Sequence, residues 1–326
     1  MILSLWYGLA LSGCANLEAS VTALVDRVAD AFQPQAESEA DPERAAQAEA
    51  IYQEALTLAR QGRPKEAAIG FRDAAELGHA AAAYALGEAY NEGRGVEQRP
   101  DLAASWFNTA AARGDARGQF IVGAAYYAGA GVKQDHGAAV GYLTKAAEQG
   151  HPRAQFLLGE AFANGRGVHK ELDWAARWYG MAAMQGHRAA QFAYGVLHAS
   201  GLGLPRNDVA AHAWLSLAMA GGHPAAAATR NAVARRMTPA DIERAELRAA
   251  RFVPRASGGP GDPPTVMYVE QRLIGLGYDV GPVDGVLGER TRAAVLTYQS
   301  TKGLAADGWI SPQLLQSLRA DGRRTG

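Results

Sequence analysis

The chain of 326 residues contains one cysteine, which excludes a disulfide framework and any metal site built from several thiolates. It also lacks an excess of charge of one sign, since 32 Lys and Arg residues stand against 33 Asp and Glu residues. Because such a chain has no net positive field, no nucleic-acid partner is expected. No apolar run reaches the roughly 18–20 residues that a membrane-spanning helix needs. The hydrophobic share of 48% is typical of a folded protein, and the length suggests two domains.

Residues 1–13 form an apolar run that suits the hydrophobic part of an export signal. The run ends in Leu11-Ser12-Gly13-Cys14, which resembles the lipobox of bacterial lipoproteins. The resemblance implies cleavage before Cys14, lipidation of its thiol and, because Ala15 follows rather than Asp, delivery to the outer membrane. No Lys or Arg precedes the run, and the alternatives are another kind of export signal and an ordinary apolar N-terminus with a buried free thiol.

Residues 14–43 are expected to form a tether between the membrane and the folded part of the chain. From position 33 to 43 the segment carries acidic residues and prolines but no apolar side chain larger than alanine. A segment of this composition cannot bury a hydrophobic core and should remain solvated.

Glycines recur with a period of 36 residues through the middle of the chain. Three columns keep this period without an insertion: Gly78, Gly114, Gly150, Gly186 and Gly222; Gly87, Gly123, Gly159 and Gly195; and the Gly-x-Gly pairs that begin at Gly93, Gly129, Gly165 and Gly201. Each unit predicts two antiparallel helices with a tight connection that needs positive φ. The glycine in the middle of each first helix indicates that the second helix approaches closely there.

This pattern resembles the Sel1-like repeat, a relative of the tetratricopeptide repeat. The resemblance covers residues 80–223 as four units, and residues 44–79 look like a first unit closer to the tetratricopeptide repeat. Capping helices follow, the last of which opens with a capping box at Thr238 and Asp241. The expected fold is all-α, with a solenoid of about five two-helix repeats over residues 44–253.

Solenoids of this kind bind proteins or peptides along a groove. By analogy with the tetratricopeptide repeat, the groove candidates are an aromatic column and two nearby arginines: Tyr84, Phe120, Phe156 and Phe192, with Arg117 and Arg153. The same rings serve equally well as packing between helices, which is the commoner role of aromatic residues at repeat spacing. Both interpretations stay open at the level of the sequence.

Several histidines share one repeat position, but they do not predict a metal site. His151, His187 and His223 lie one repeat apart, and His79 stands in the same column. Successive repeats are separated by roughly 8–10 Å, whereas zinc ligands must all lie about 2 Å from one ion. We therefore expect neither a metal nor a cofactor.

Residues 254–265 contain four prolines and three glycines and are expected to be a linker. Residues 266–322 then predict a small domain of three helices with turns at Asp284-Gly285 and Asp307-Gly308. This domain resembles the three-helix peptidoglycan-binding domain of many cell-wall hydrolases, through the residues Gln271, Leu273, Leu276-Gly277-Tyr278, Gly281, Val283-Asp284-Gly285, Gly288, Thr291, Ala294-Val295, Tyr298-Gln299, Gly303-Leu304 and Asp307-Gly308.

The resemblance implies that the domain binds peptidoglycan. A glycan strand offers hydroxyls, acetamides and flat sugar faces, so amide, guanidinium and aromatic side chains are the candidates for its recognition: Arg272, Tyr278, Arg292, Tyr298 and Gln299. The alternative for Tyr298 is burial of its ring in the face of the second helix. Asp284 and Asp307 are expected to cap backbone N–H groups of their own loops.

Once these segments are subtracted, no stretch long enough for a catalytic domain remains, and no metalloprotease, serine-nucleophile or phosphate-loop motif is present. The expected function is therefore that of a non-catalytic scaffold in the periplasm. It would be anchored by a lipid at Cys14 and would bind peptidoglycan and an unidentified envelope protein. In domain content the chain also resembles the periplasmic part of an alphaproteobacterial polar-localisation factor. Two alternatives remain: a regulatory subunit of a separate cell-wall hydrolase, and a cytosolic signalling adaptor with a non-binding C-terminal module.

Overall fold

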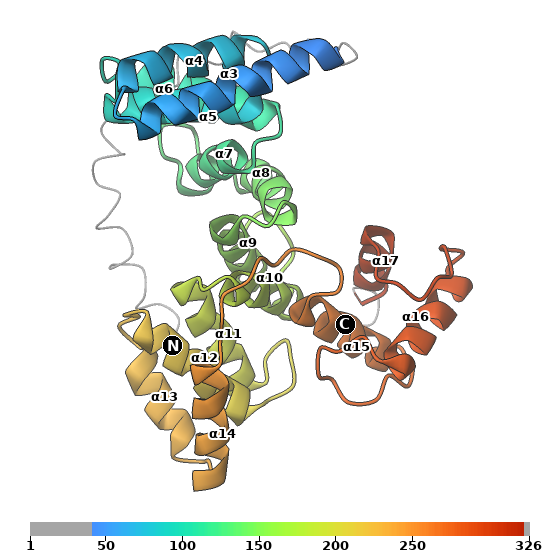
Figure 1. Ribbon diagram of the computed structural model, residues 1–326. Helices are drawn as coiled ribbons and strands as arrows, with labels where there is room; N and C mark the ends of the chain where they lie inside the picture. The colour runs from blue at the N-terminus through green and yellow to red at the C-terminus, as the bar shows by residue number, and fades with distance from the viewer. Residues whose placement is uncertain (1–40, 323–326) are drawn as a thin grey trace. The chain divides into compact units, whose positions relative to one another are not determined.

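The computed structural model describes residues 41–322, which form fifteen α-helices and no β-strand, as expected for an all-α fold (Figure 1). The expected signal peptide, Cys14 and the tether up to position 40 lie outside the described residues. Within the described range, no helix has both the length and the apolar character required to cross a bilayer. These residues fall into two compact units that divide between Ala146 and Ala147, in the last turn of one helix.

The helices of the first unit are arranged as three consecutive antiparallel pairs. They are α3 (Pro42–Arg60) with α4 (Pro64–Glu76), α5 (Ala80–Glu92) with α6 (Pro100–Ala112), and α7 (Ala116–Ala128) with α8 (His136–Glu148). Helix α3 begins inside the segment expected to be a tether, because Asp41 caps its first turn and proline at its first position favours the start of a helix.

The second unit contains two further pairs, two terminal helices and a three-helix domain. The pairs are α9 (Pro152–Asn164) with α10 (Leu172–Met184) and α11 (Arg188–Ser200) with α12 (Asp208–Ala220). The terminal helices are α13 (Ala226–Ala234) and α14 (Pro239–Ala250), and the domain consists of α15 (Pro263–Gly275), α16 (Glu289–Thr301) and α17 (Pro312–Gly322). Five helix pairs and a small C-terminal helical domain match the architecture expected from the sequence.

The mid-helix glycines mark the closest contact within each pair. A Cβ at Gly159 would lie 2.7 Å from the ring of Tyr179 on the partner helix, and one at Gly195 would lie 2.9 Å from Leu215. Both distances are shorter than any normal carbon contact, so a side chain there would force the second helix away. The structure thus confirms the packing role predicted for this column.

The histidine column caps the first helices of the repeats. The Nδ1 atoms of His79, His151 and His187 accept hydrogen bonds from backbone N–H groups three residues later, at 3.1–3.3 Å. Asp115 occupies the same position before α7 and caps that helix in the same way. Burial lowers the pKa of His187 to about 4, so its imidazole is neutral at physiological pH and its Nδ1 can act as an acceptor.

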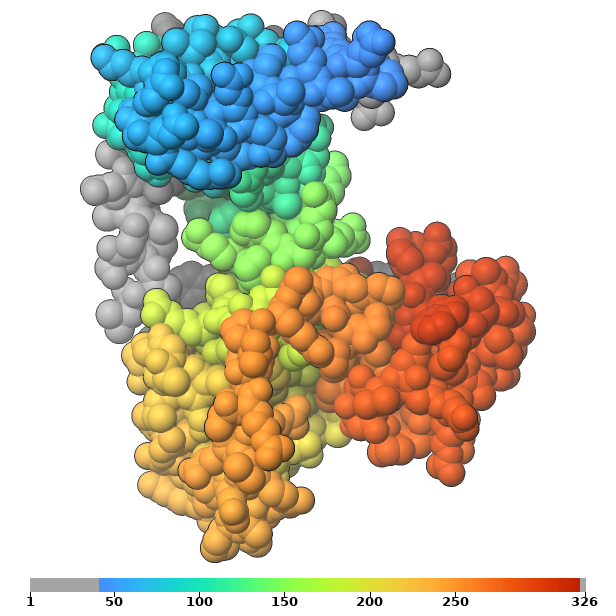
Figure 2. Space-filling model, in the orientation of Figure 1, coloured from blue at the N-terminus to red at the C-terminus, as the bar shows by residue number. Residues whose placement is uncertain are grey.

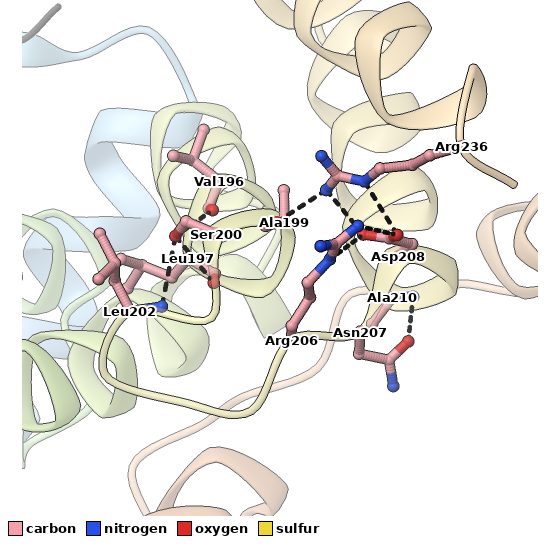
Figure 3. Close-up of polar contacts among 10 residues, drawn as sticks. All are labelled: Val196, Leu197, Ala199, Ser200, Leu202, Arg206, Asn207, Asp208, Ala210 and Arg236. Carbon is pink, nitrogen blue, oxygen red and sulfur yellow. Dashed lines mark hydrogen bonds and ion pairs between the residues drawn. The ribbon is translucent and has the colours of Figure 1, made fainter.

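Polar contacts attach the terminal helices to the pair α11–α12 (Figure 3). Asp208, at the start of α12, accepts hydrogen bonds from Arg206 and from Arg236, which lies just beyond α13. Arg236 also donates to the carbonyl of Ala199 at 2.7 Å. The hydrogen bonds from Arg236 and Arg206 lower the pKa of Asp208 to about 2. The expected capping box between Thr238 and Asp241 is present at the start of α14.

Candidate functional site

The groove candidates of the first unit are packed against one another. The Arg117 guanidinium carbon lies 4.1 Å from the ring centroid of Tyr84, and the carboxylate of Asp115 holds the guanidinium at 2.7 Å. The Tyr84 hydroxyl donates to Glu88 at 3.1 Å, and burial raises the pKa of Tyr84 to about 12. Phe120 is only 8% exposed and belongs to the core. Tyr84 and Arg117 thus remain half-buried surface groups, whereas Phe120 packs between helices.

In the second unit the same aromatic column stacks on two residues of the histidine column, the helix cap His187 and its equivalent His223. The Phe156 ring lies 4.8 Å from that of His187, and the Phe192 ring lies 4.2 Å from that of His223. Both phenylalanines are half-buried, and Arg153 is exposed. Each ring therefore contributes to the contact between successive repeats while keeping one part accessible.

The structure places two of the five glycan-binding candidates inside the C-terminal domain. Tyr298 and Gln299 are each 1% exposed. The Tyr298 hydroxyl donates to Asp321 at 2.8 Å, and the Gln299 amide forms four hydrogen bonds that tie down the turn from Asp307 to Trp309. This correction follows from their place on the inner face of α16, where both side chains are enclosed and maintain the fold.

The remaining three candidates have different environments. Arg272 forms an ion pair of 2.6 Å with Asp173 of α10 and is largely covered. Tyr278 is half-buried, with its ring 6.0 Å from that of Tyr298 and its hydroxyl 3.4 Å from Thr301. Arg292 alone is exposed, and its guanidinium lies 4.1 Å from the ring centroid of Trp309.

Trp309 is the surface aromatic residue that the sequence analysis missed. It follows the Asp307-Gly308 turn and is 55% exposed, although large apolar side chains are usually covered. Leu296 lies one turn after Arg292 on the same face of α16 and is 43% exposed. Arg292, Leu296 and Trp309 together form an exposed surface of the domain. We call this three-residue surface the exposed ring face. The sequence did contain a signal for this exposed residue. A tryptophan directly after a glycine turn lies outside any helix.

The two Asp-Gly turns are stabilised as expected. The Asp284 carboxylate accepts from the Val286 N–H at 2.8 Å, and that of Asp307 accepts from the Trp309 N–H at 2.9 Å. Across residues 41–322 no group of three or more His, Cys, Asp or Glu side chains is arranged to hold a metal ion.

The buried carboxyl group of Glu270 connects the Asp284-Gly285 turn to the helices of the C-terminal domain. Glu270 on α15 is 0% exposed, and it accepts hydrogen bonds from the Gly285 N–H at 3.0 Å and from the Thr291 hydroxyl at 3.2 Å. Burial raises the pKa of Glu270 to about 7. The folded state therefore binds this proton more tightly than the unfolded state does.

Replacing Glu270 with glutamine should change how stability depends on pH. The stabilisation that a protonated Glu270 gives is complete below its unfolded pKa of 4.5 and is lost as pH rises through about 7. Glutamine stays neutral, so Glu270→Gln should gain stability relative to wild type between pH 4.5 and 8, on the order of 2 kcal/mol. Thermal unfolding at a series of pH values measures this difference. The exposed Glu289→Gln is the control, and a difference independent of pH would contradict the interpretation.

Two known families match the sequence of the chain, one in the repeats and one in the C-terminal domain. The Sel1 repeat model matches residues 80–115, 116–151, 152–187 and 188–223. Four consecutive segments of the chain therefore match the Sel1 repeat. Residues 262–318 match the family described as "Putative peptidoglycan binding domain", which covers α15, α16 and most of α17. These matches cover α5 to α12 and the C-terminal domain, whereas α3, α4, α13 and α14 lie outside them.

Solved structures with related folds support the same assignment. A protective antigen with an SLR fold from uropathogenic Escherichia coli is 32% identical, with a TM-score of 0.55 over 64% of this chain and 46% of that chain. A Sel1 repeat protein from Oxalobacter formigenes is 24% identical, with a TM-score of 0.51 over 64% of this chain and 87% of that chain. The second likeness concerns the fold alone.

Among curated proteins, N-acetylmuramoyl-L-alanine amidase CwlM of Mycobacterium tuberculosis is similar to a short stretch of the chain. The identity is 41% over 69 residues, which is 21% of this chain and 17% of the amidase. The chain therefore spans less than a fifth of the length of this relative.

Proposed function

We propose that the Sel1-repeat protein is a non-catalytic scaffold of the cell envelope that binds peptidoglycan through its C-terminal domain and a protein partner through its repeats. The observation that carries the proposal is the exposed ring face of Arg292, Leu296 and Trp309 on a domain of a peptidoglycan-binding family. An indole offers a flat apolar surface to a sugar ring. The adjacent guanidinium can donate to acetamide and carboxylate oxygens.

The rest of the proposal follows from the other parts of the chain. Sel1 repeats are protein-interaction modules, and Tyr84 with Arg117 offers an aromatic and cationic surface in the first unit. The sequence Leu11-Ser12-Gly13-Cys14 supports a lipid anchor at Cys14 and a place in the periplasm, at the outer membrane. Two anchors on one chain would raise the local concentration of a bound partner near the wall.

Trp309→Ala should reduce binding to the wall. We expect the full-length protein, with Cys14→Ser to prevent lipidation, to pellet with purified sacculi. Trp309→Ala and Arg292→Ala should each weaken this pelleting about tenfold, or ~1.4 kcal/mol, because each removes one of the three side chains of the exposed ring face. Arg290→Ala is the matched control, since Arg290 is an exposed arginine on the same helix.

Two outcomes of this assay would count against the proposal. Wild-type binding by Trp309→Ala would place the ligand elsewhere on the domain, and no pelleting of the wild type would favour the cytosolic adaptor. Soluble muropeptides released by the purified protein would indicate catalysis. The similarity to an amidase over 69 residues favours, as the second candidate, a regulatory subunit of a separate hydrolase. That function requires the added hydrolase to release more muropeptides when this protein is present.

A further inference from the structure

The third Sel1 match, residues 152–187 with helices α9 and α10, is called the third repeat below, and it carries side chains on α10 that the other three matches lack. Three positions of its second helix differ in kind from their equivalents: Trp174 where the others have Leu102, Ala138 and Ala210; Arg177 where they have Ser105, Gly141 and Ala213; and Gly180 where they have Asn108, Thr144 and Ser216. All residues from Trp174 to Ala183 are buried, whereas α6 buries only four of its thirteen residues. Helix α10 is therefore covered on a side that α6 leaves open.

The C-terminal domain makes the covering contacts at these three positions. The Trp174 ring lies 4.7 Å from that of Tyr268 in a T-shaped arrangement. Arg177 is stacked between Trp174 and Trp178 and donates through Nε to the Thr265 hydroxyl at 3.1 Å. At Gly180, an added Cβ would lie only 2.7 Å from the ring of Pro264. The unusual residues of α10 thus fit the start of α15.

Two acidic side chains at the start of α10 complete the contact. In the second and fourth repeats, Asp135 and Asn207 cap the second helix with their own side chains. Glu171 occupies the equivalent position but caps nothing. Its carboxylate instead accepts a bidentate pair of hydrogen bonds from Arg319 of α17, at 2.8 and 2.9 Å. Asp173, two residues later, forms the ion pair with Arg272 of α15.

The segment expected to be a linker is bound to the same repeat. The Gln155 and Gln185 amides donate to the carbonyl of Ser257 at 2.9 and 3.2 Å, and the Arg255 N–H donates to the Met184 carbonyl at 3.0 Å. Ser257 is only 4% exposed. In Figures 1 and 2 this orange segment runs over the third repeat before it enters α15. We refer to residues 254–262 as the strap.

We propose that the third repeat is a dedicated docking site for the C-terminal domain, so that the domain is fixed on the repeats and does not swing on a flexible linker. Docking uses α15 and α17, whereas Arg292, Leu296 and Trp309 lie on α16 and the loop that follows it. The exposed ring face is therefore presented in one orientation relative to the third and fourth repeats. The docking does not depend on whether the domain binds the wall.

Hydrogen exchange of the full-length protein, followed by mass spectrometry, tests the docking. We expect the Arg255 amide and the amides of α10 to exchange slowly in the wild type. The double reversal Arg272→Glu/Arg319→Glu sets four carboxylates against one another across the contact. In that variant, exchange in the strap and in α10 should accelerate at least tenfold. Protection in α16 should persist, because the domain has its own buried core of Leu273, Val295, Leu314 and Leu318.

The control is Arg251→Glu/Arg290→Glu, which makes the same change of charge at two exposed positions and should leave exchange unaltered. The proposal is overturned if the wild-type strap exchanges as fast as an unstructured peptide, a result that needs no variant to fold. It is also overturned if the double reversal leaves strap and α10 exchange unchanged. Since neither readout involves peptidoglycan, failure of the docking and failure of wall binding are separate results.

Discussion

Gly95→Ala is expected to lower the midpoint of the first thermal unfolding transition by about 10 °C, whereas Gly62→Ala should lower it by only about 3 °C. Both glycines belong to the first unit and have nearly the same left-handed backbone, with φ of +78° and +73°. The loss of left-handed freedom costs an alanine about 1 kcal/mol at either position. The large difference must therefore come from what surrounds each residue.

The surroundings of Gly95 leave no room for a side chain. An added Cβ would lie 2.1 Å from the Pro64 carbonyl oxygen at the start of α4, whereas one at Gly62 would meet nothing within 4 Å. A backbone carbonyl cannot rotate away as a flexible side chain can, so the Gly-x-Gly connection and α4 must separate. We estimate about 3–4 kcal/mol for this change. Equal midpoints for the two variants would show that backbone conformation, and not contact between repeats, explains the glycine column.

Arg319→Ala is expected to destabilise the second unit by about 3 kcal/mol, and Glu171→Gln by only about 1 kcal/mol. The asymmetry follows from burial, because the Glu171 side chain is 6% exposed and that of Arg319 is 23% exposed. Removal of the arginine leaves a covered carboxylate without its cation. Removal of the negative charge leaves a guanidinium that can still reach water and still stacks 4.6 Å from the Phe162 ring.

Urea unfolding followed by tryptophan fluorescence measures both variants, since Trp174 lies in this contact. Arg319→Lys is the matched control: it retains the charge but loses the bidentate geometry, so it should fall between the other two. Equal losses for Arg319→Ala and Glu171→Gln would mean that water reaches Glu171 freely. That result would also count against the proposed docking of the C-terminal domain on the third repeat.

The sequence was a good guide to features that depend on neighbours along the chain. The period of 36 residues placed the helix pairs, and the mid-helix glycines identified the closest contacts, such as that of Gly159 with Tyr179. The turns capped by Asp284 and Asp307 also formed as expected. Each of these features depends on backbone conformation or on one adjacent helix, which a repeated local pattern specifies directly.

The sequence was a poor guide to which polar side chains face solvent. Tyr298 and Gln299 carry the chemistry of sugar recognition, yet both satisfy their hydrogen bonds inside the domain. The capping role of the histidine column was also missed, although its position just before each first helix was a usable signal. Amphipathic side chains serve equally well in a core network and on a surface, so residue type alone does not separate the two uses.

The sequence by itself determined the all-α repeats, their register and the small helical domain that follows them, because local backbone preferences and a constant period specify those features. Only the tertiary structure decided that the C-terminal domain lies on the third repeat, through contacts such as Glu171 with Arg319 across 148 positions. It also decided that Trp309, rather than Tyr298, is the exposed ring. The physical reason is that such contacts depend on complementary shape and charge between distant segments, which become neighbours only when the chain has folded.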